Sequence, residues 1–409
     1  YTDKTKLDEI TKEIQQKIKE KQARISKIKE LLDATPSDIE RLKLNEEISN
    51  CLNEVKDLRN KLAETMAPEK MYEKISQDKI SIEISDELID LVSPEKGAEL
   101  VAQTVKVRQN LADKLGYVIP AVHFKDSETL EANEYSINVR GIPTLTGYVY
   151  PGYRMFYPDR INMDRKPKDG IEDFDSINGE KVYWIPEEKT KDFWEKGFSP
   201  EEVIAKNLEY ISVKYVDEIL DYADLNKYLD LVGVQNIFLI EGLVPDFLSL
   251  GDLRYIFASL IREKVPLKDI IYIFERLNDL SQENSKEGII EELRITLNRH
   301  ISRSIADENR VIYGITLSDK IIENFEKELL KDPGESITIK GSLIKKASKQ
   351  IKQFIEESDV PIEHIAIISP ISIRQMLFVI FEEIIPGISV ISKEEISKEF
   401  TLEVIGNVE

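Results

Sequence analysis

The sequence predicts a multidomain α+β protein with a helical hairpin at its N-terminus. Its 409 residues are more than one hydrophobic core usually covers. Apolar residues recur at helical spacing through residues 1–66, and strand and helix patterns alternate further along the chain. We therefore expect an N-terminal helical hairpin, an α/β subdomain with a small insertion, a helical subdomain and a C-terminal α/β subdomain.

Two apolar stripes predict the hairpin. Aliphatic side chains recur every three, four or seven residues through 7–32, and a second stripe covers 48–66. Between them, the Thr-Pro-Ser-Asp sequence at 35–38 supplies a helix cap, a proline for the first turn and an acid for the positive helix end. Two long helices joined by so short a turn should fold back antiparallel. We assign residues 1–78 to the hairpin and its linker, and expect Cys51 to be a buried apolar side chain.

The first α+β subdomain is predicted at 79–156 and 198–219. Isoleucines alternate with polar residues through 80–84, as in a half-buried strand. The helix that follows should end at Gly116, because glycine readily takes the positive φ of a helix C-terminus. The other expected elements are a helix at 94–115, strands at 118–124, 135–140 and 147–153, and a helix at 200–225.

A polar stretch predicts a small insertion at 157–197. It is rich in Asp, Lys and Pro, and Asn178 precedes a glycine in a turn signal. It should hold a strand at 181–185 and a polar helix up to Trp194. Beyond it we expect a helical subdomain at 220–300 and a C-terminal α/β subdomain at 301–409. The latter should alternate strands at 311–316, 336–339, 365–368, around 390 and at 400–405 with helices at 318–330, 342–357 and 371–383.

Charge and composition limit the partners and the compartment. The formal net charge is −21, and all of it lies in 67–409, because 1–66 hold 14 basic and 14 acidic side chains. This excess keeps the protein soluble or attracts basic partners, and it argues against nucleic acid. No apolar run approaches the roughly 20 residues of a membrane helix, and no signal peptide is recognised. A single cysteine fits a reducing cytosol, and Tyr1 in place of Met suggests a trimmed fragment.

The sequence contains no catalytic, metal or cofactor motif. The three histidines, His123, His300 and His364, are far apart and lack the spacing of a helical metal site. Phosphate-binding loops, dinucleotide-binding loops and CxxC pairs are absent. We therefore expect a binding or structural protein, and neither an enzyme nor a metal or cofactor carrier.

Two separated stretches resemble one known family. The first is GYVIPAVHFKD at 116–126, which continues at Leu130, 133–135, Gly141 and 150–152; the second covers 243–245, Leu250, Leu253 and 260–270. Both resemble the cytosolic domain of the FlhA family, the export-gate proteins of bacterial flagella and virulence injectisomes. The similarity covers about four fifths of the chain, from about Ile80 to Glu409.

The resemblance implies four subdomains at the cytoplasmic face of the bacterial inner membrane, below a membrane-embedded half that this chain lacks. It also implies an insertion in the first subdomain, and a helical third subdomain that builds a nine-membered ring. The implied partners are export chaperone–substrate complexes and other export-apparatus proteins. The long N-terminal hairpin differs from the short linker that the resemblance implies.

The resemblance places cargo docking in an apolar dimple between the first subdomain and its insertion. The acidic residue of the dimple maps on Asp175, whereas its Phe falls at Asn178, beside Ile177, and its Thr falls at Lys206. Flagellar-type chaperone binding is therefore doubtful, and an injectisome gate or a divergent flagellar one is expected. Lys206 and Asp175 should form an exposed ion pair at a polar rim. The predicted apolar floor is Trp184, Gly197, Phe198, Val203 and Leu208.

Two functions remain open from the sequence. The first is the cytosolic part of a type III export gate, a ring that docks substrates and chaperones and passes them to the membrane channel. The alternative is a soluble oligomeric scaffold that kept this fold and self-associates through its N-terminal hairpin, as a coiled coil.

Overall fold

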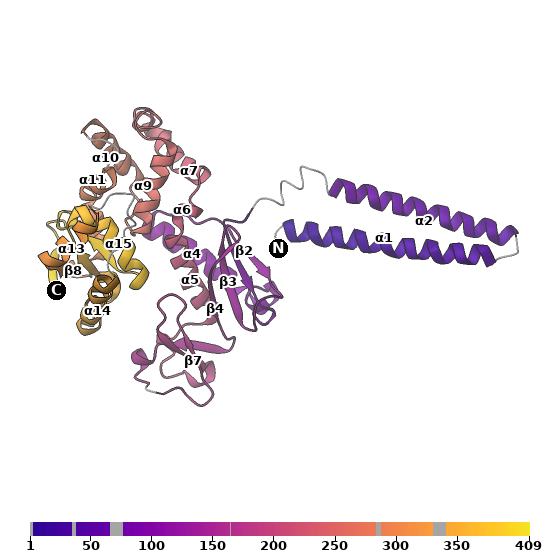
Figure 1. Cartoon of the computed structure of the whole chain (residues 1–409), viewed down its shortest axis with the longest axis horizontal. Helices are drawn as coiled ribbons and strands as arrows, with labels where there is room; N and C mark the ends of the chain where they lie inside the picture. Colours follow the sequence, from indigo (N-terminus) through magenta and orange to yellow (C-terminus); the bar gives the residue numbers. More distant parts are fainter. Residues whose placement is uncertain (1–2, 35–37, 66–76, 164, 284–287, 330–340) are drawn as a thin grey trace.

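The structure is a computed structural model that describes residues 3–34, 38–65, 77–163, 165–283, 288–329 and 341–409. Figure 1 shows a body of helices and sheets, from which the N-terminal hairpin extends. The expected α+β class is confirmed, because the body contains two four-stranded sheets and one three-stranded sheet among its helices.

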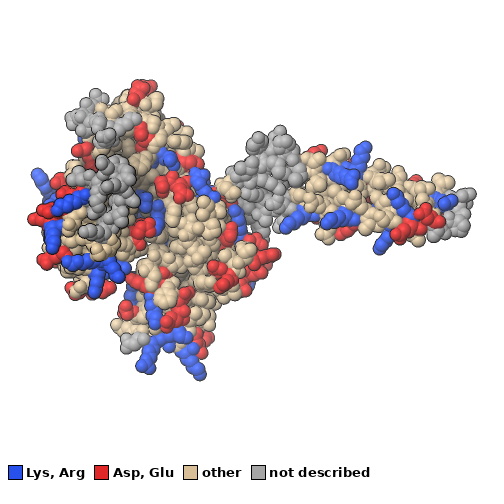
Figure 2. All heavy atoms as spheres, viewed as in Figure 1, with Lys and Arg blue, Asp and Glu red and all other residues tan. Residues whose placement is uncertain are grey.

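The hairpin consists of α1 (Asp3–Ala34) and α2 (Asp38–Thr65), which run side by side in opposite directions (Figure 1). Residues 35–37 of the predicted turn lie outside the described residues. The facing stripes bury a small core of their own: Ile25, Ile28, Ile48, Cys51 and Val55. Acidic and basic side chains are interspersed along its surface (Figure 2), so this element carries no strong field of either sign.

The first sheet has the strand order β2-β1-β3-β4. Its strands are β1 (Ile80–Ile84), β2 (Val122–Asp126), β3 (Glu134–Val139) and β4 (Ile142–Tyr148). β1 and β2 are parallel and are joined by α4 (Glu99–Leu115), whereas β3 and β4 pair antiparallel. Gly116 ends α4 at φ +67°, and a Cβ at this position would lie 2.9 Å from the backbone carbon of Leu267. Glycine therefore allows α4 to end against the connection that follows α9 (Leu250–Arg262).

Two strand predictions in this subdomain are wrong. The predicted strand at 118–124 begins only at Val122, because Arg108 takes the carbonyls of Ile119 and Pro120 at 3.0 and 3.1 Å and Pro120 has no N–H to donate. The predicted strand at 147–153 is instead the end of β4 and the start of β5 (Tyr153–Phe156), which lie in different sheets. A turn with Gly152 at φ +82° separates them.

The insertion is a three-stranded antiparallel sheet with the order β5-β7-β6. β6 (Ile171–Phe174) is a strand that the sequence did not predict, because its two acidic residues are unfavourable in strands; β7 (Lys181–Pro186) was expected. Since β5 belongs to this sheet, the sheet starts before the predicted boundary at 157. The polar helix expected up to Trp194 is two short 3₁₀ turns, at 187–189 and 194–196.

Helices dominate the middle of the chain. The helix predicted at 200–225 is divided, because the chain leaves helical geometry near Tyr215 and Leu220. The described helices are α5 (Pro200–Lys214), α6 (Val216–Ile219), α7 (Tyr222–Asn236), α8 (Phe238–Glu241), α9 (Leu250–Arg262), α10 (Ile270–Glu283), α11 (Ile289–Thr296) and α12 (Asn298–Ile305). Their buried faces join the core of the first sheet.

The C-terminal unit contains a parallel sheet of order β10-β9-β8-β11. Its strands are β8 (Val311–Leu317), β9 (Ile365–Ile368), β10 (Ser389–Ile391) and β11 (Thr401–Val408), and its helices are α13 (Asp319–Leu329), α14 (Gly341–Ser358) and α15 (Ile371–Ile384). All four residues of β9 are buried, as in a parallel sheet covered on both faces. The strand predicted at 336–339 lies outside the described residues.

Candidate functional site

A cleft of about 1410 Å³ separates three parts of the body. One wall is formed by α4, α5 and the turn between β6 and β7. The other walls come from the connection between α9 and α10, from α12, and from the loop between α15 and β10. Because units far apart in the sequence meet here, the cleft is a candidate docking space.

The predicted docking residues divide into two groups. Ile177, Asn178 and Lys206 line the cleft. Trp184 and Val203 do not form an accessible floor, because their exposed fractions are only 1% and 7%. Trp184 packs edge-on against Tyr150, with 5.4 Å between the ring centroids. Trp184 and Val203 therefore keep the family spacing because they belong to the core of the fold. The prediction that they form the floor of the docking site is wrong.

Phe198 lies between these groups. It is half-buried and forms an isolated backbone bridge with Met155 of β5. Its ring lies 5.6 Å from the Lys206 ammonium and 6.3 Å from the Tyr157 ring. Phe198 therefore supports the lysine at the cleft wall and does not itself line the cleft.

Asp175 is buried below the rim of the cleft, with its side chain only 3% exposed. Its Oδ2 accepts hydrogen bonds from the Tyr157 hydroxyl and, at 3.0 Å, from the Lys206 ammonium. Its Oδ1 accepts from the backbone N–H of Ile177 at 2.8 Å and from that of Asn178 at 3.4 Å. The expected exposed ion pair is therefore wrong: the carboxylate is buried, and it fixes the turn that carries Ile177 and Asn178.

The pKa values follow from this geometry. Burial by itself raises the pKa of Asp175, but the Lys206 charge and the hydrogen bonds from Tyr157 and Ile177 outweigh it, so the pKa is lowered. Burial and the hydrogen bond to Asp175 raise the pKa of the Tyr157 hydroxyl. At neutral pH the group is thus an ionised carboxylate held by a neutral phenol and an ammonium.

The charge of the cleft is opposite to the charge of the chain. Ten Lys and Arg side chains line it, against five Glu side chains, whereas the chain as a whole carries −21. These residues come from separate elements between Lys114 and Glu399. The sequence analysis did not predict this basic cleft, because no local run of basic residues indicates it.

A buried ionic network lies behind the cleft. Glu263 at the end of α9 pairs with Arg294 of α11 at 3.1 Å, and also with Arg374 of α15. Arg374 contacts Glu291 at 2.5 Å, and Arg294 contacts Glu395 at 2.5 Å. Both arginine side chains are at most 2% exposed. The network therefore joins the helical unit to the C-terminal unit.

Two further searches concern only the described residues. Within them, no group of three His, Cys, Asp or Glu side chains is placed to hold a metal ion. No helix of these ranges is long and apolar enough to cross a membrane.

The fold places the chain in a class of proteins. A complex of the Chlamydia pneumoniae CdsV and CdsO proteins matches with a TM-score of 0.68 and 22% identity, over 81% of this chain and 98% of that one. The nonameric SctV-C of enteropathogenic E. coli (EPEC) matches with a TM-score of 0.60 and 16% identity, over 81% and 99%. The chain therefore has the fold of the cytosolic domains of type III export-gate proteins.

The sequence model of the FHIPEP family matches residues 11–401, and the chain belongs to this family. The match includes most of the hairpin, whereas the motifs in the sequence pointed only to the region from about Ile80. The flagellar biosynthesis protein FlhA of Bacillus subtilis is 23% identical over 376 residues, which are 90% of this chain and 54% of that protein. The chain thus spans about half the length of the curated relatives that it matches.

Proposed function

We propose that the chain is the cytosolic part of a type III export gate, a ring at the cytoplasmic face of the bacterial inner membrane. The ring docks export chaperones with their cargo and passes the cargo toward the membrane channel. The observation that carries this proposal is the family match over residues 11–401, and the cleft supplies a docking space. We also propose that the chain acts by binding alone, without catalysis.

An exposed apolar patch on the helical unit supports the ring. Four apolar side chains at α7 and α8 are largely exposed. They are Leu231 (64%) and Val234 (80%) of α7, Ile237 (53%) between the helices, and Phe238 (64%) of α8. A contiguous exposed patch of this kind is typical of a protein interface. In SctV-C of EPEC the assembly is a nonamer, and we propose that this chain forms a comparable ring through the patch.

Changing Val234→Asp should raise the concentration needed for ring assembly at least tenfold, which corresponds to about 1.4 kcal/mol of binding free energy. The reason is that a carboxylate would be buried in an apolar contact. Mass photometry across protein concentrations measures this, and Val118→Asp is the matched control, because Val118 is 57% exposed but lies outside the patch. Rings that persist in Val234→Asp and vanish when residues 1–66 are removed would instead support the hairpin-based scaffold.

Docking is proposed at the rim formed by Ile177 and Asn178, next to Lys206. Changing Ile177→Asp should weaken binding of the chaperone encoded with the same export apparatus at least tenfold, because the apolar contact at the rim is lost. Isothermal titration calorimetry measures the affinity. Ile142→Asp is the control, because Ile142 is 63% exposed and lies outside the cleft. Equal affinities of both variants and the parent would refute docking at this rim.

A further inference from the structure

Six cations of the cleft have no carboxylate partner among the described residues. They are Arg160, Arg262, Lys264, Lys268, Arg303 and Arg310. The remaining basic side chains of the cleft are paired; for example, Lys214 contacts Glu383 at 3.0 Å and Arg299 contacts Glu399 at 3.2 Å. Unpaired cations gathered between low-dielectric walls produce a focused positive potential.

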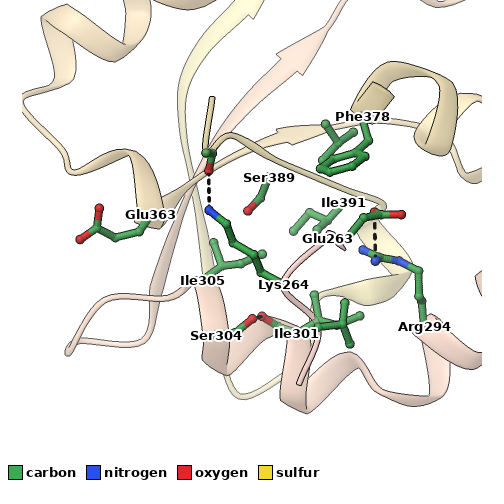
Figure 3. Close-up of a pocket in the computed structure, with 13 residues that line it drawn as sticks. Glu263, Lys264, Arg294, Ile301, Ser304, Ile305, Glu363, Phe378, Ser389 and Ile391 are labelled. Carbon is green, nitrogen blue, oxygen red and sulfur yellow. Dashed lines mark hydrogen bonds and ion pairs between the residues drawn. The ribbon is translucent and has the colours of Figure 1, made fainter. Parts of the chain in front are cut away.

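Lys264 is one of these unpaired cations on the cleft wall. Figure 3 shows its side chain crossing a small cavity, with the ammonium at the carbonyl oxygen of Gly387, 3.3 Å away. The Glu363 carboxylate points away from it (Figure 3). Desolvation by the surrounding walls lowers the pKa of Lys264 from its ordinary value, although the side chain still reaches solvent in the cleft. An anion that entered the cleft would restore the missing charge partner.

The cleft is also apolar between its cations. The half-buried apolar side chains that line it are Ile177, Val213, Pro266, Ile362 and Phe400. The ligand that suits such a surface carries both carboxylates and aliphatic side chains. Polypeptide supplies both.

We propose that this basic cleft binds an acidic, partly apolar segment of the docked export partner. The proposal rests on the proposed function, and adds the chemistry of the segment that is recognised. A protein segment fits better than nucleic acid, because the chain as a whole carries −21 and long polyphosphates would be repelled by the acidic surface outside the cleft. A second copy of this chain fits less well for the same reason.

The probe is a fluorescein-labelled peptide in which Glu and Leu are arranged to form an amphipathic helix. Its binding to the full chain is measured by fluorescence anisotropy. The double reversal Lys268→Glu with Arg303→Glu should weaken binding at least tenfold, and binding to the parent should weaken as salt rises. Both side chains are exposed, so the fold should tolerate the changes. The matched control is Lys320→Glu with Lys349→Glu, two exposed lysines outside the cleft, which should bind the peptide as the parent does.

Four results would overturn the proposal. One is no binding of the acidic peptide to the parent. Another is equal loss in the control and the cleft variant, which would indicate a general charge effect. A third is that a peptide of Lys and Leu binds as tightly as the acidic peptide. The fourth is tighter cleft-dependent binding of oligothymidine, which would indicate a nucleic-acid site. The proposed function fails separately: a parent that binds the peptide in the cleft but not the chaperone contradicts chaperone docking and still supports the acidic-segment site.

Discussion

Replacing Arg374 with methionine is expected to lower the free energy of unfolding by about 3–5 kcal/mol, because breaking a buried ion pair leaves its partners uncompensated. The guanidinium is fully buried and pairs with both Glu263 and Glu291. Its Nε donates to Glu291 at 2.7 Å, and an Nη donates to the carbonyl of Val390 at 3.4 Å. Methionine fills much of the space but supplies no donor.

The charge state of Arg374 supports this expectation. Burial by itself lowers the pKa of Arg374, but the hydrogen bond to Glu291 and the charge of Glu263 outweigh it, and the pKa is raised. Glu263 would retain Arg294 at 3.1 Å. Glu291 makes no other ion pair among the described residues, so it would lose its cation outright.

Urea unfolding followed by circular dichroism measures the effect, with Arg276→Met as the matched control. Arg276 pairs with Asp279 at 3.0 Å on the surface of α10, and the two side chains are 34% and 63% exposed. Such a pair contributes at most about 1 kcal/mol. If the two variants lost equal stability, the network would not hold the helical and C-terminal units together.

Replacing Asp175 with alanine is expected to lower the free energy of unfolding by about 2–3 kcal/mol, because hydrogen bonds to a buried charged group are lost. Tyr157 and the N–H groups of the turn would lose their acceptor, and Lys206 would keep only the Tyr157 hydroxyl, at 2.7 Å. Docking at Ile177 would weaken too, since the turn loses its anchor. For this reason an Asp175 variant cannot by itself test docking.

The effect should depend on pH with a defined sign. Because the pKa of Asp175 is lowered in the folded state, its stabilisation is fully present above the unfolded value of about 3.9. It is lost as the pH falls through the lower folded value, where the native carboxylate also becomes protonated. The stability difference between Asp175→Ala and the parent should therefore be constant near neutral pH and shrink under acid.

Thermal unfolding at pH 7 and at acid pH measures this difference. Asp169→Ala is the control, because the Asp169 side chain is 58% exposed and pairs with Lys189 on the same insertion. It should cost less than about 1 kcal/mol at any pH. A pH-independent loss in Asp175→Ala would show that the carboxylate charge does not support the turn.

The sequence predicted those helices and strands that depend only on the spacing of residues within the element itself. The hairpin stripes, the alternating isoleucines of β1 and the glycine that ends α4 each depend on spacing along a single helix or strand. Predictions failed where another segment took over a backbone group, as Arg108 does before β2, or where acidic residues concealed a strand, as in β6. The subdomain boundaries stay predictions.

The sequence by itself determined the α+β class, the hairpin, and the motifs that pointed to the family. Only the tertiary structure decided which of the predicted site residues reach solvent: Trp184 and Val203 became core, whereas Ile177 and Lys206 line the cleft. It also brought together the ion pairs of Arg374 and the basic cleft. The physical reason is that the element packed against a charged side chain decides whether that charge has a partner. Periodicity along the chain contains no information on which elements pack together.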